Sequence, residues 1–148
     1  DFCLSRGLGD VYKRQILASL FHQGMVIAID RESGEWQPVL EALDHPHSVR
    51  VLDEHHFTVA DTVRGRALLV SLNGERGKVE LEVAVGTSWL QDCLYDYHHD
   101  CWVLVDGEHS RIVLRSGPSG SKALAQFDLD PEWRLYEVLL TMTGIVAL

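Results

Sequence analysis

The chain has few cysteines, little positive charge and no long apolar run. Its 148 residues include 3 cysteines, and 13 Lys or Arg stand against 22 Asp or Glu, for a net charge of −9. Nucleic acids and anionic membranes attract proteins mainly through Lys and Arg, so this composition disfavours both as partners. No apolar run reaches the length of a membrane span, and no signal peptide is visible. We therefore expect no nucleic acid and no membrane as partner, and the localisation stays open.

Several motifs of common enzymes are also missing. There is no Gly-x-Ser-x-Gly nucleophile elbow, no phosphate-binding loop and no zinc spacing of Cys and His. In the strand register below, Cys93 and Cys101 fall on neighbouring strands without facing each other, so we expect two buried or half-buried thiols. No segment has a convincing helical period over ten residues, although 132–142 could pass for one. The pattern therefore favours an all-β chain.

Residues 1–15, DFCLSRGLGDVYKRQ, share nothing with the rest of the chain and have no hydrophobic period. They resemble the translated adapter read-through found at broken ends of metagenomic reading frames, which implies no function and a natural chain that began further upstream. An ordinary disordered N-terminus is the alternative. We set this segment aside and assign residues 16–148 to one folded unit, with 20 acidic residues (22 − 2) and 10 basic residues (13 − 3).

A long repeat lies in the middle of the chain. Phe57–Val70 reads FTVADTVRGRALLV, and Trp102–Arg115, 45 positions later, reads WVLVDGEHSRIVLR. Each copy has an apolar run, an Asp, a four-residue polar turn, an Arg and a second apolar run. The recurring charged residues are Asp61 with Asp106 (106 − 61 = 45) and Arg66 with Arg111 (111 − 66 = 45). A period of about 40–45 residues with four short strands is typical of a β-propeller blade.

Apolar runs between turn signals predict the strands. Gly24–Ile29 and Trp36–Leu40 come first, and Pro38 marks the second as an edge strand. Two cycles of four strands follow: Val49–Leu52, Phe57–Ala60, Arg66–Leu72 and Lys78–Val85, then Cys93–Tyr95, Trp102–Val105, Arg111–Arg115 and Ala123–Phe127. A further cycle opens at Arg134–Thr141.

The predicted fold is therefore an all-β, incomplete β-propeller, with two full four-stranded antiparallel blades and partial blades at each end. Closed propellers have about four to eight blades, so this length of chain does not close a ring. Open β edges at its two ends could pair with another copy, and self-association through these edges is a further expectation.

Three segments resemble parts of NHL-type repeats. VADTVRGRALLV and VDGEHSRIVL resemble the strand–turn–strand core of such a repeat, and LDHPHSV resembles the loop that opens its blade. The match covers roughly residues 43–114. The resemblance implies a six-bladed type of propeller and no particular activity, because these propellers include hydrolases, lactonases, peptide- and RNA-binding modules and scaffolds.

The repeated charged residues are interpreted as architecture. In a hairpin with a four-residue turn, Asp61 can face Arg66, and Asp106 can face Arg111. Such a cross-strand pair contributes about 0.2–1 kcal/mol, and the Asp can also accept hydrogen bonds from the turn.

The positions where the copies differ are the better candidates for function. When the copies are aligned with an offset of 45 residues, the inner strands begin at His47, Asp92 and Glu137 (92 − 47 = 137 − 92 = 45). Inner strands line the channel of a propeller, so these groups could hold a divalent cation. Carboxylates favour Ca²⁺ or Mg²⁺, and the imidazole favours a transition metal. Propeller hydrolases that resemble regucalcin and gluconolactonase have their metal in that place. Polar residues that merely line a wet channel are the alternative.

Other histidines lie at both ends of the predicted blades. His45 and His109 lie on the same face as His47, and an imidazole there could act as a general base if a carboxylate such as Asp92 oriented it. His55–His56 and His98–His99 lie in turns on the opposite face, where we expect solvated side chains. Trp89 and Trp133 precede inner strands and either pack between blades or stack on a ligand.

Two functions remain open. The first is a binding or scaffold propeller for a small-molecule or protein ligand. Its ligand face would carry His45, His47, Gln91, Asp92 and His109. The alternative is a metal-dependent hydrolase of lactonase or esterase type, with the cation on His47, Asp92 and Glu137.

Overall fold

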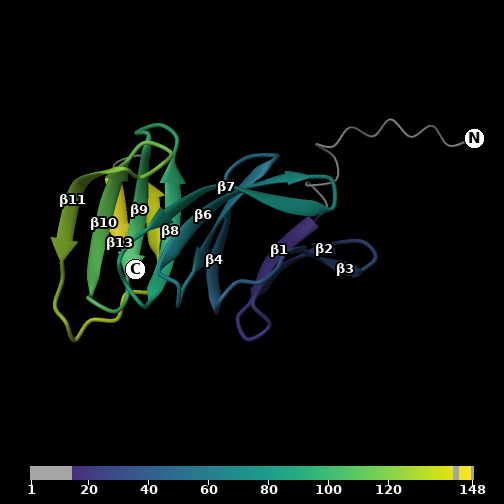
Figure 1. Ribbon diagram of the computed structural model, residues 1–148, viewed down its shortest axis with the longest axis horizontal. Helices are drawn as coiled ribbons and strands as arrows, with labels where there is room; N and C mark the ends of the chain where they lie inside the picture. Colours follow the sequence, from purple (N-terminus) through teal and green to yellow (C-terminus); the bar gives the residue numbers. More distant parts are fainter. Residues whose placement is uncertain (1–14, 142–143, 148) are drawn as a thin grey trace, which may run out of the picture.

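The computed structural model of the protein describes residues 15–141 and 144–147. The N-terminal segment that we set aside lies outside the described residues, except for Gln15. All regular structure in the described ranges is β-strand (Figure 1). The strands are β1 (Gln15–Leu20), β2 (Met25–Asp30), β3 (Trp36–Leu40), β4 (Pro46–Val51), β5 (His56–Asp61), β6 (Arg66–Asn73), β7 (Arg76–Ala84), β8 (Leu90–Asp96), β9 (Cys101–Asp106), β10 (Arg111–Ser116), β11 (Lys122–Asp128), β12 (Val138–Thr141) and β13 (Gly144–Ala147). Over these ranges no helix is long and apolar enough to cross a membrane.

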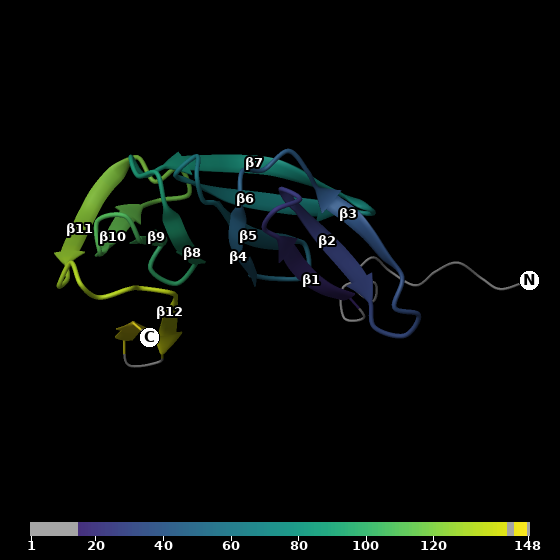
Figure 2. The same cartoon turned by 90° about the horizontal axis from the view of Figure 1, so that it is seen from below.

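Consecutive strands pair antiparallel into four sheets, which we call blade 1 (β1–β3), blade 2 (β4–β7), blade 3 (β8–β11) and blade 4 (β12–β13). Blades 2 and 3 have four strands, and blades 1 and 4 are partial. Figure 2 shows the sheets following one another along an arc, with β4, β8 and β12 on its inner side and β7 and β11 on its outer side. The predicted fold class, an incomplete β-propeller, is confirmed.

Four details differ from the sequence prediction. Blade 1 has three strands, because β1 pairs along its whole length with β2, from Gln15 opposite Asp30 to Leu20 opposite Met25. Strand β4 begins at Pro46, within the expected loop. The last predicted strand begins at Val138, and β13 pairs with it. Residues 132–137 form no helix. The edge position of β3 is confirmed, whereas self-association through the open edges stays a prediction.

The middle strands of blades 2 and 3 are buried on both faces because each of these blades packs against two neighbours. Along β5, Phe57 and Val59 belong to the apolar cluster between blades 1 and 2, and Ala60 belongs to the cluster between blades 2 and 3. Alternate residues of a strand point to opposite faces, so the nearly continuous apolar sequence of β5 supplies two interfaces.

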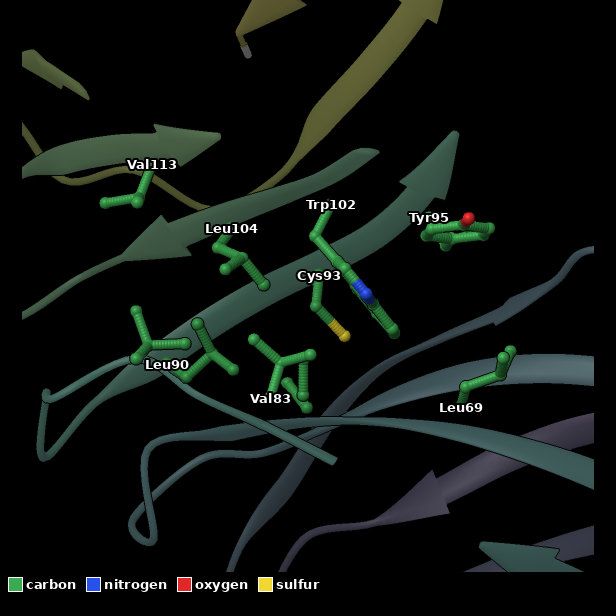
Figure 3. Packing of buried hydrophobic residues seen from close by; sticks show 11 residues of the cluster. Leu69, Val83, Leu90, Cys93, Tyr95, Trp102, Leu104 and Val113 are labelled. Atoms are coloured by element: carbon green, nitrogen blue, oxygen red, sulfur yellow. The ribbon is translucent and has the colours of Figure 1, made fainter. Parts of the chain in front are cut away.

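Equivalent large aromatic residues fill equivalent interfaces. Trp102, 45 positions after Phe57, is fully buried between blades 2 and 3, and its indole N–H donates to the Pro118 carbonyl at 2.8 Å. Figure 3 shows its ring beside Cys93, with Leu69 and Val83 of blade 2 across the interface. Phe57 and Trp102 thus pack between neighbouring blades. Both Cys93 and Cys101 are buried free thiols on neighbouring strands, as expected.

A hydrogen bond holds the segment that leaves each of blades 1, 2 and 3 against a turn of the same blade. The turn residues that accept these bonds are Gly24, Gly65 and Ser110, which directly precede β2, β6 and β10 and all have a positive φ. Their carbonyl groups accept N–H bonds from Leu43, Val85 and Leu129 respectively, each at 2.9 Å. Gly65 needs to be glycine, because a methyl group there would lie 1.8 Å from the Thr87 carbonyl oxygen. The loop between blades 2 and 3 is thus fixed against the preceding hairpin.

Candidate functional site

Asp92 joins the inner strands of three blades. This residue of β8 is fully buried, and its Oδ1 and Oδ2 accept bonds from Arg50 of β4, Nε at 3.0 Å and Nη2 at 2.6 Å. The Ser48 hydroxyl donates to Oδ1 as well. The Val138 N–H of β12 donates to Oδ2 at 2.8 Å. A buried carboxylate requires such compensation, so Asp92 and Arg50 together fix the inner side of the arc.

The three residues predicted to hold a cation are not brought together as ligands. His47 Nδ1 lies 2.9 Å from Thr62 Oγ1, and Glu137 Oε2 lies 3.6 Å from Arg50 Nη2. The Asp92 carboxylate faces Arg50. The alignment at 45 therefore found three residues of the inner strands, but it could not show that an arginine occupies the space between two of them.

Across the described ranges, potential metal ligands gather within 4.8 Å at one place, formed by Asp106, Glu108 and His109. Each of these residues is already bonded within the protein. The Asp106 carboxylate accepts from Thr87 Oγ1 at 2.6 Å and Arg111 Nε at 2.7 Å, and His109 Nδ1 lies 2.8 Å from it. Burial raises the pKa of Asp106, but these hydrogen bonds outweigh it and hold the pKa below its usual value. The three residues therefore form a hydrogen-bonded turn, and their ligand atoms already have partners within the protein.

The repeated ion pairs are present in both hairpins. Arg66 Nε donates to Asp61 at 2.7 Å, and Arg111 Nε donates to Asp106 at the same distance. Both aspartates are fully buried. Asp61 also accepts the Asp44 N–H at 2.6 Å, which positions the loop that carries His45.

A cluster of aromatic and imidazole rings brings blades 1, 2 and 3 together. Phe21, in the turn between β1 and β2, has its ring centroid 4.5 Å from that of His45 and 4.8 Å from that of His47. Trp89, just before β8, lies 5.8 Å from His47 and 6.3 Å from Phe21. His22 extends the cluster, 6.1 Å from His45. The sequence singled out His45, His47 and Trp89, but Phe21 and His22 were missed because the hairpin that carries them was not predicted.

Trp89 is fixed by two neighbours and remains 37% exposed. Its indole N–H donates to Gln91 Oε1 at 2.8 Å. Gly107 leaves room for the ring, since a methyl group at this position would lie 2.9 Å from Trp89 Cδ1. The corresponding residue of blade 2 is Thr62 (107 − 62 = 45), which instead contacts His47.

A pocket of about 220 Å³ adjoins the cluster, with His47, Arg50, Gln91 and Glu137 in its wall. Burial, and then the neighbouring His45, lower the pKa of His47, so its imidazole is neutral at neutral pH. We call the surface formed by Phe21, His45, His47, Trp89, Gln91 and this pocket the mouth face.

The proposed general base, an imidazole oriented by the Asp92 carboxylate, is not formed by His45 or His109. Asp92 faces Arg50, whereas His109 contacts Asp106, and His45 contacts Asp44 at 2.6 Å. His109 lies in the next hairpin of the same face. The paired histidines of the opposite turns are bonded locally: His56 lies against Asp53 and His99 against Asp96.

No family model matches the sequence, and no curated protein matches it. A solved structure titled "Crystal structure of Nidogen/Laminin Complex" contains a chain with a similar fold, at a TM-score of 0.67 and 11% identity. The match covers 91% of this chain and 51% of that chain, so the protein spans about half the length of the chain that it resembles. At this identity the likeness shows the fold alone. The protein therefore has the fold of a β-propeller that comprises two full blades and two partial ones.

Proposed function

We propose that this chain is the ligand-binding part of a propeller built from NHL-like repeats, and that it binds a protein or peptide segment at the mouth face. One observation carries the proposal: aromatic and imidazole side chains from three blades gather at a single mouth beside a pocket. The NHL assignment itself depends on the repeated motifs in residues 43–114.

These side chains lie outside the buried apolar clusters between the blades. The apolar clusters between neighbouring blades are formed by residues such as Phe57 and Trp102, and they do not include Phe21, His47 or Trp89. Partly exposed aromatic residues at the centre of a surface are typical of protein interfaces, where they supply a large share of the binding energy. The similar propeller was solved in a complex with a second protein, which supports a protein ligand over a small molecule.

The contacts of the described residues do not favour the hydrolase alternative. A hydrolase of the predicted type needs the Asp92 carboxylate on a cation, and this carboxylate has three donors from the protein itself, on Arg50, Ser48 and Val138. The binding module requires only the exposed mouth face.

The proposal can be tested with a displayed library of random peptides of about twelve residues, selected on the whole chain. Binding of each selected peptide is then measured to the wild type, Trp89→Ala and Trp36→Ala. Trp36 is a matched control, since it is 61% exposed on β3, an outer strand. We expect Trp89→Ala to lose at least about tenfold in affinity and Trp36→Ala to bind normally. Equal binding to all three proteins, or selection of no peptide, would contradict the proposal.

A further inference from the structure

We infer that the mouth face recognises a basic side chain, Lys or Arg, of its ligand, held on the indole of Trp89 beside Glu108. This inference deepens the proposed function and rests on it. It is based on the orientation of one aromatic ring and on the distribution of charge around it.

The polar edge of Trp89 is already used within the protein, so a ligand at the mouth face meets the ring rather than the indole N–H. The indole N–H is bonded to Gln91 Oε1 at 2.8 Å, and Cδ1 lies over Gly107. More than a third of the side chain is still exposed. The face of an indole ring carries negative potential, and tryptophan is the best of the aromatic side chains at attracting ammonium and guanidinium groups.

A carboxylate is bonded to the segment that leads into Trp89. Glu108 Oε2 accepts the Ser88 N–H at 2.5 Å and Thr87 Oγ1 at 3.1 Å, and these are the two residues that precede Trp89. The pKa of Glu108 is lowered by these hydrogen bonds, the one from the Ser88 N–H first, so the carboxylate is ionised at neutral pH. An aromatic face next to a carboxylate provides both contacts that a Lys or Arg side chain makes.

Two more exposed carboxylates border the same surface. The Glu137 side chain is 52% exposed in the wall of the pocket, together with Gln91, the partner of Trp89. Asp44 is 37% exposed and holds His45 of the ring cluster. The mouth face thus has carboxylates on more than one side of the ring cluster.

The arginines of this face are committed to buried carboxylates. Arg50 binds Asp92 and lies 3.6 Å from Glu137, and Arg111 binds Asp106. Arg64 donates to Asp61 at 3.2 Å and to the Ala42 carbonyl at 2.6 Å. His47, being neutral, adds no positive charge. The charged side chains at the mouth face therefore have a negative net charge, in agreement with the net charge of −9 for the chain.

This distribution selects between ligands. A ligand with an acidic side chain at the mouth would face Glu108, and the described arginines nearby are already paired with carboxylates. Like-charge contacts at an interface are costly. A basic side chain gains both the ring and the carboxylate, and the field of the whole chain accelerates its approach.

The experiment begins from peptides selected on the whole chain. Each Lys or Arg in them is replaced by Met, and the dissociation constants are measured on the wild type, Glu108→Gln and Glu80→Gln. Glu80 is the matched control, an exposed carboxylate on the outer strand β7. We expect the selected peptides to share one basic residue. Its replacement should weaken binding to the wild type roughly tenfold, and much less to Glu108→Gln.

The outcomes separate the inference from the proposed function. Peptides that require Trp89 but contain no basic residue, or tolerate its replacement, would overturn the inference and leave the binding function in place. An equal effect of Glu108→Gln and Glu80→Gln would also overturn the inference, since the local carboxylate would then contribute nothing beyond net charge. Failure to select any peptide would overturn the binding function and the inference with it.

Discussion

Blades 2 and 3 share one frame and differ at the mouth. Both have a buried Asp paired with an Arg across the second hairpin, and both have a positive-φ residue whose carbonyl group holds the segment that leaves the blade. At the mouth, blade 2 has His47 against Thr62. Blade 3 has Asp92 against Arg50, and it has Gly107 beneath Trp89.

This difference separates the shared frame of the two blades from the candidate site. The Asp and Arg that recur 45 residues apart pair the strands of the second hairpin in blades 2 and 3. Residues that do not recur give the two halves of the mouth different chemistry, an imidazole with a hydroxyl on one side and an indole on the other. A binding site at a channel mouth needs only one copy of each such group.

The largest expected effect is on the shared frame. Gly65→Ala should destabilise the chain by about 3 kcal/mol, because the new methyl group meets the Thr87 carbonyl and the backbone keeps a positive φ. Gly74→Ala is the control: it has a similar φ, with nothing within 4 Å of the added carbon, and should cost about 1 kcal/mol. Urea unfolding of both variants measures the difference. Equal losses of unfolding free energy in the two variants would show that the close approach of Gly65 to the Thr87 carbonyl does not contribute to stability.

The next effect concerns the ion pair between the two blades. Arg50→Met leaves Asp92 buried without its main partner and should cost about 3 kcal/mol or slightly less. Adding Asp92→Asn should recover part of this loss. In contrast, Glu82→Gln, which breaks the exposed pair with Arg66, should cost less than about 1 kcal/mol. A double-mutant cycle in urea unfolding gives the coupling energy, and an absence of coupling between Arg50 and Asp92 would refute this account of the inner strands.

A smaller effect should follow from adding a side chain at position 107, because the equivalent position of the blade 2 hairpin, Thr62, already carries one. Gly107→Ala pushes a methyl group against Trp89 and should shift the tryptophan fluorescence and weaken peptide binding several-fold, at a cost in stability of about 1 kcal/mol. Thr62→Val removes the contact of His47 and keeps Trp89 in place. If Gly107→Ala leaves both fluorescence and binding unchanged, the position of Trp89 is not essential.

The smallest effect is the pH dependence contributed by His47. Its pKa is lowered by burial from the usual 6.5, so the unfolded chain takes up this proton at a higher pH than the folded chain. The contribution to stability is therefore complete above pH 6.5 and is lost as the pH falls through 6.5 toward the folded pKa. His47→Gln should reduce the loss of stability between about pH 7.5 and about pH 5.5. His98→Gln, in a turn of the opposite face, is the comparison, and an identical pH profile in all three proteins would contradict the prediction.

The repeat explains why so much of the frame could be predicted. Two copies aligned at 45 determine which residues pair across each hairpin, and Asp61 opposite Arg66 follows directly. Strand β1 had no second copy in the sequence for comparison, and its first residue, Gln15, fell at the boundary of the segment set aside. The repeat was therefore sufficient for blades 2 and 3, whereas in blade 1 the local pattern predicted β2 and β3 but not β1.

The mouth was harder to predict because its contacts depend on how the blades are placed. Phe21 reaches Trp89 across the arc, a relation between residues of different blades that no hairpin register contains. Arg50 occupies an ordinary strand position, and only the approach of β4 to β8 brings it onto Asp92. His45 and His47 could be found because they depart from the repeat beside a recognisable loop.

The central claim is that the mouth face binds a ligand, and photo-crosslinking tests it most directly. A selected peptide that carries a photoreactive phenylalanine analogue is bound to the whole chain and irradiated, and mass spectrometry locates the crosslinks. The account predicts crosslinks at Phe21, His45, His47 and Trp89. Crosslinks concentrated in the opposite turns, around Tyr97 and His55, would contradict it.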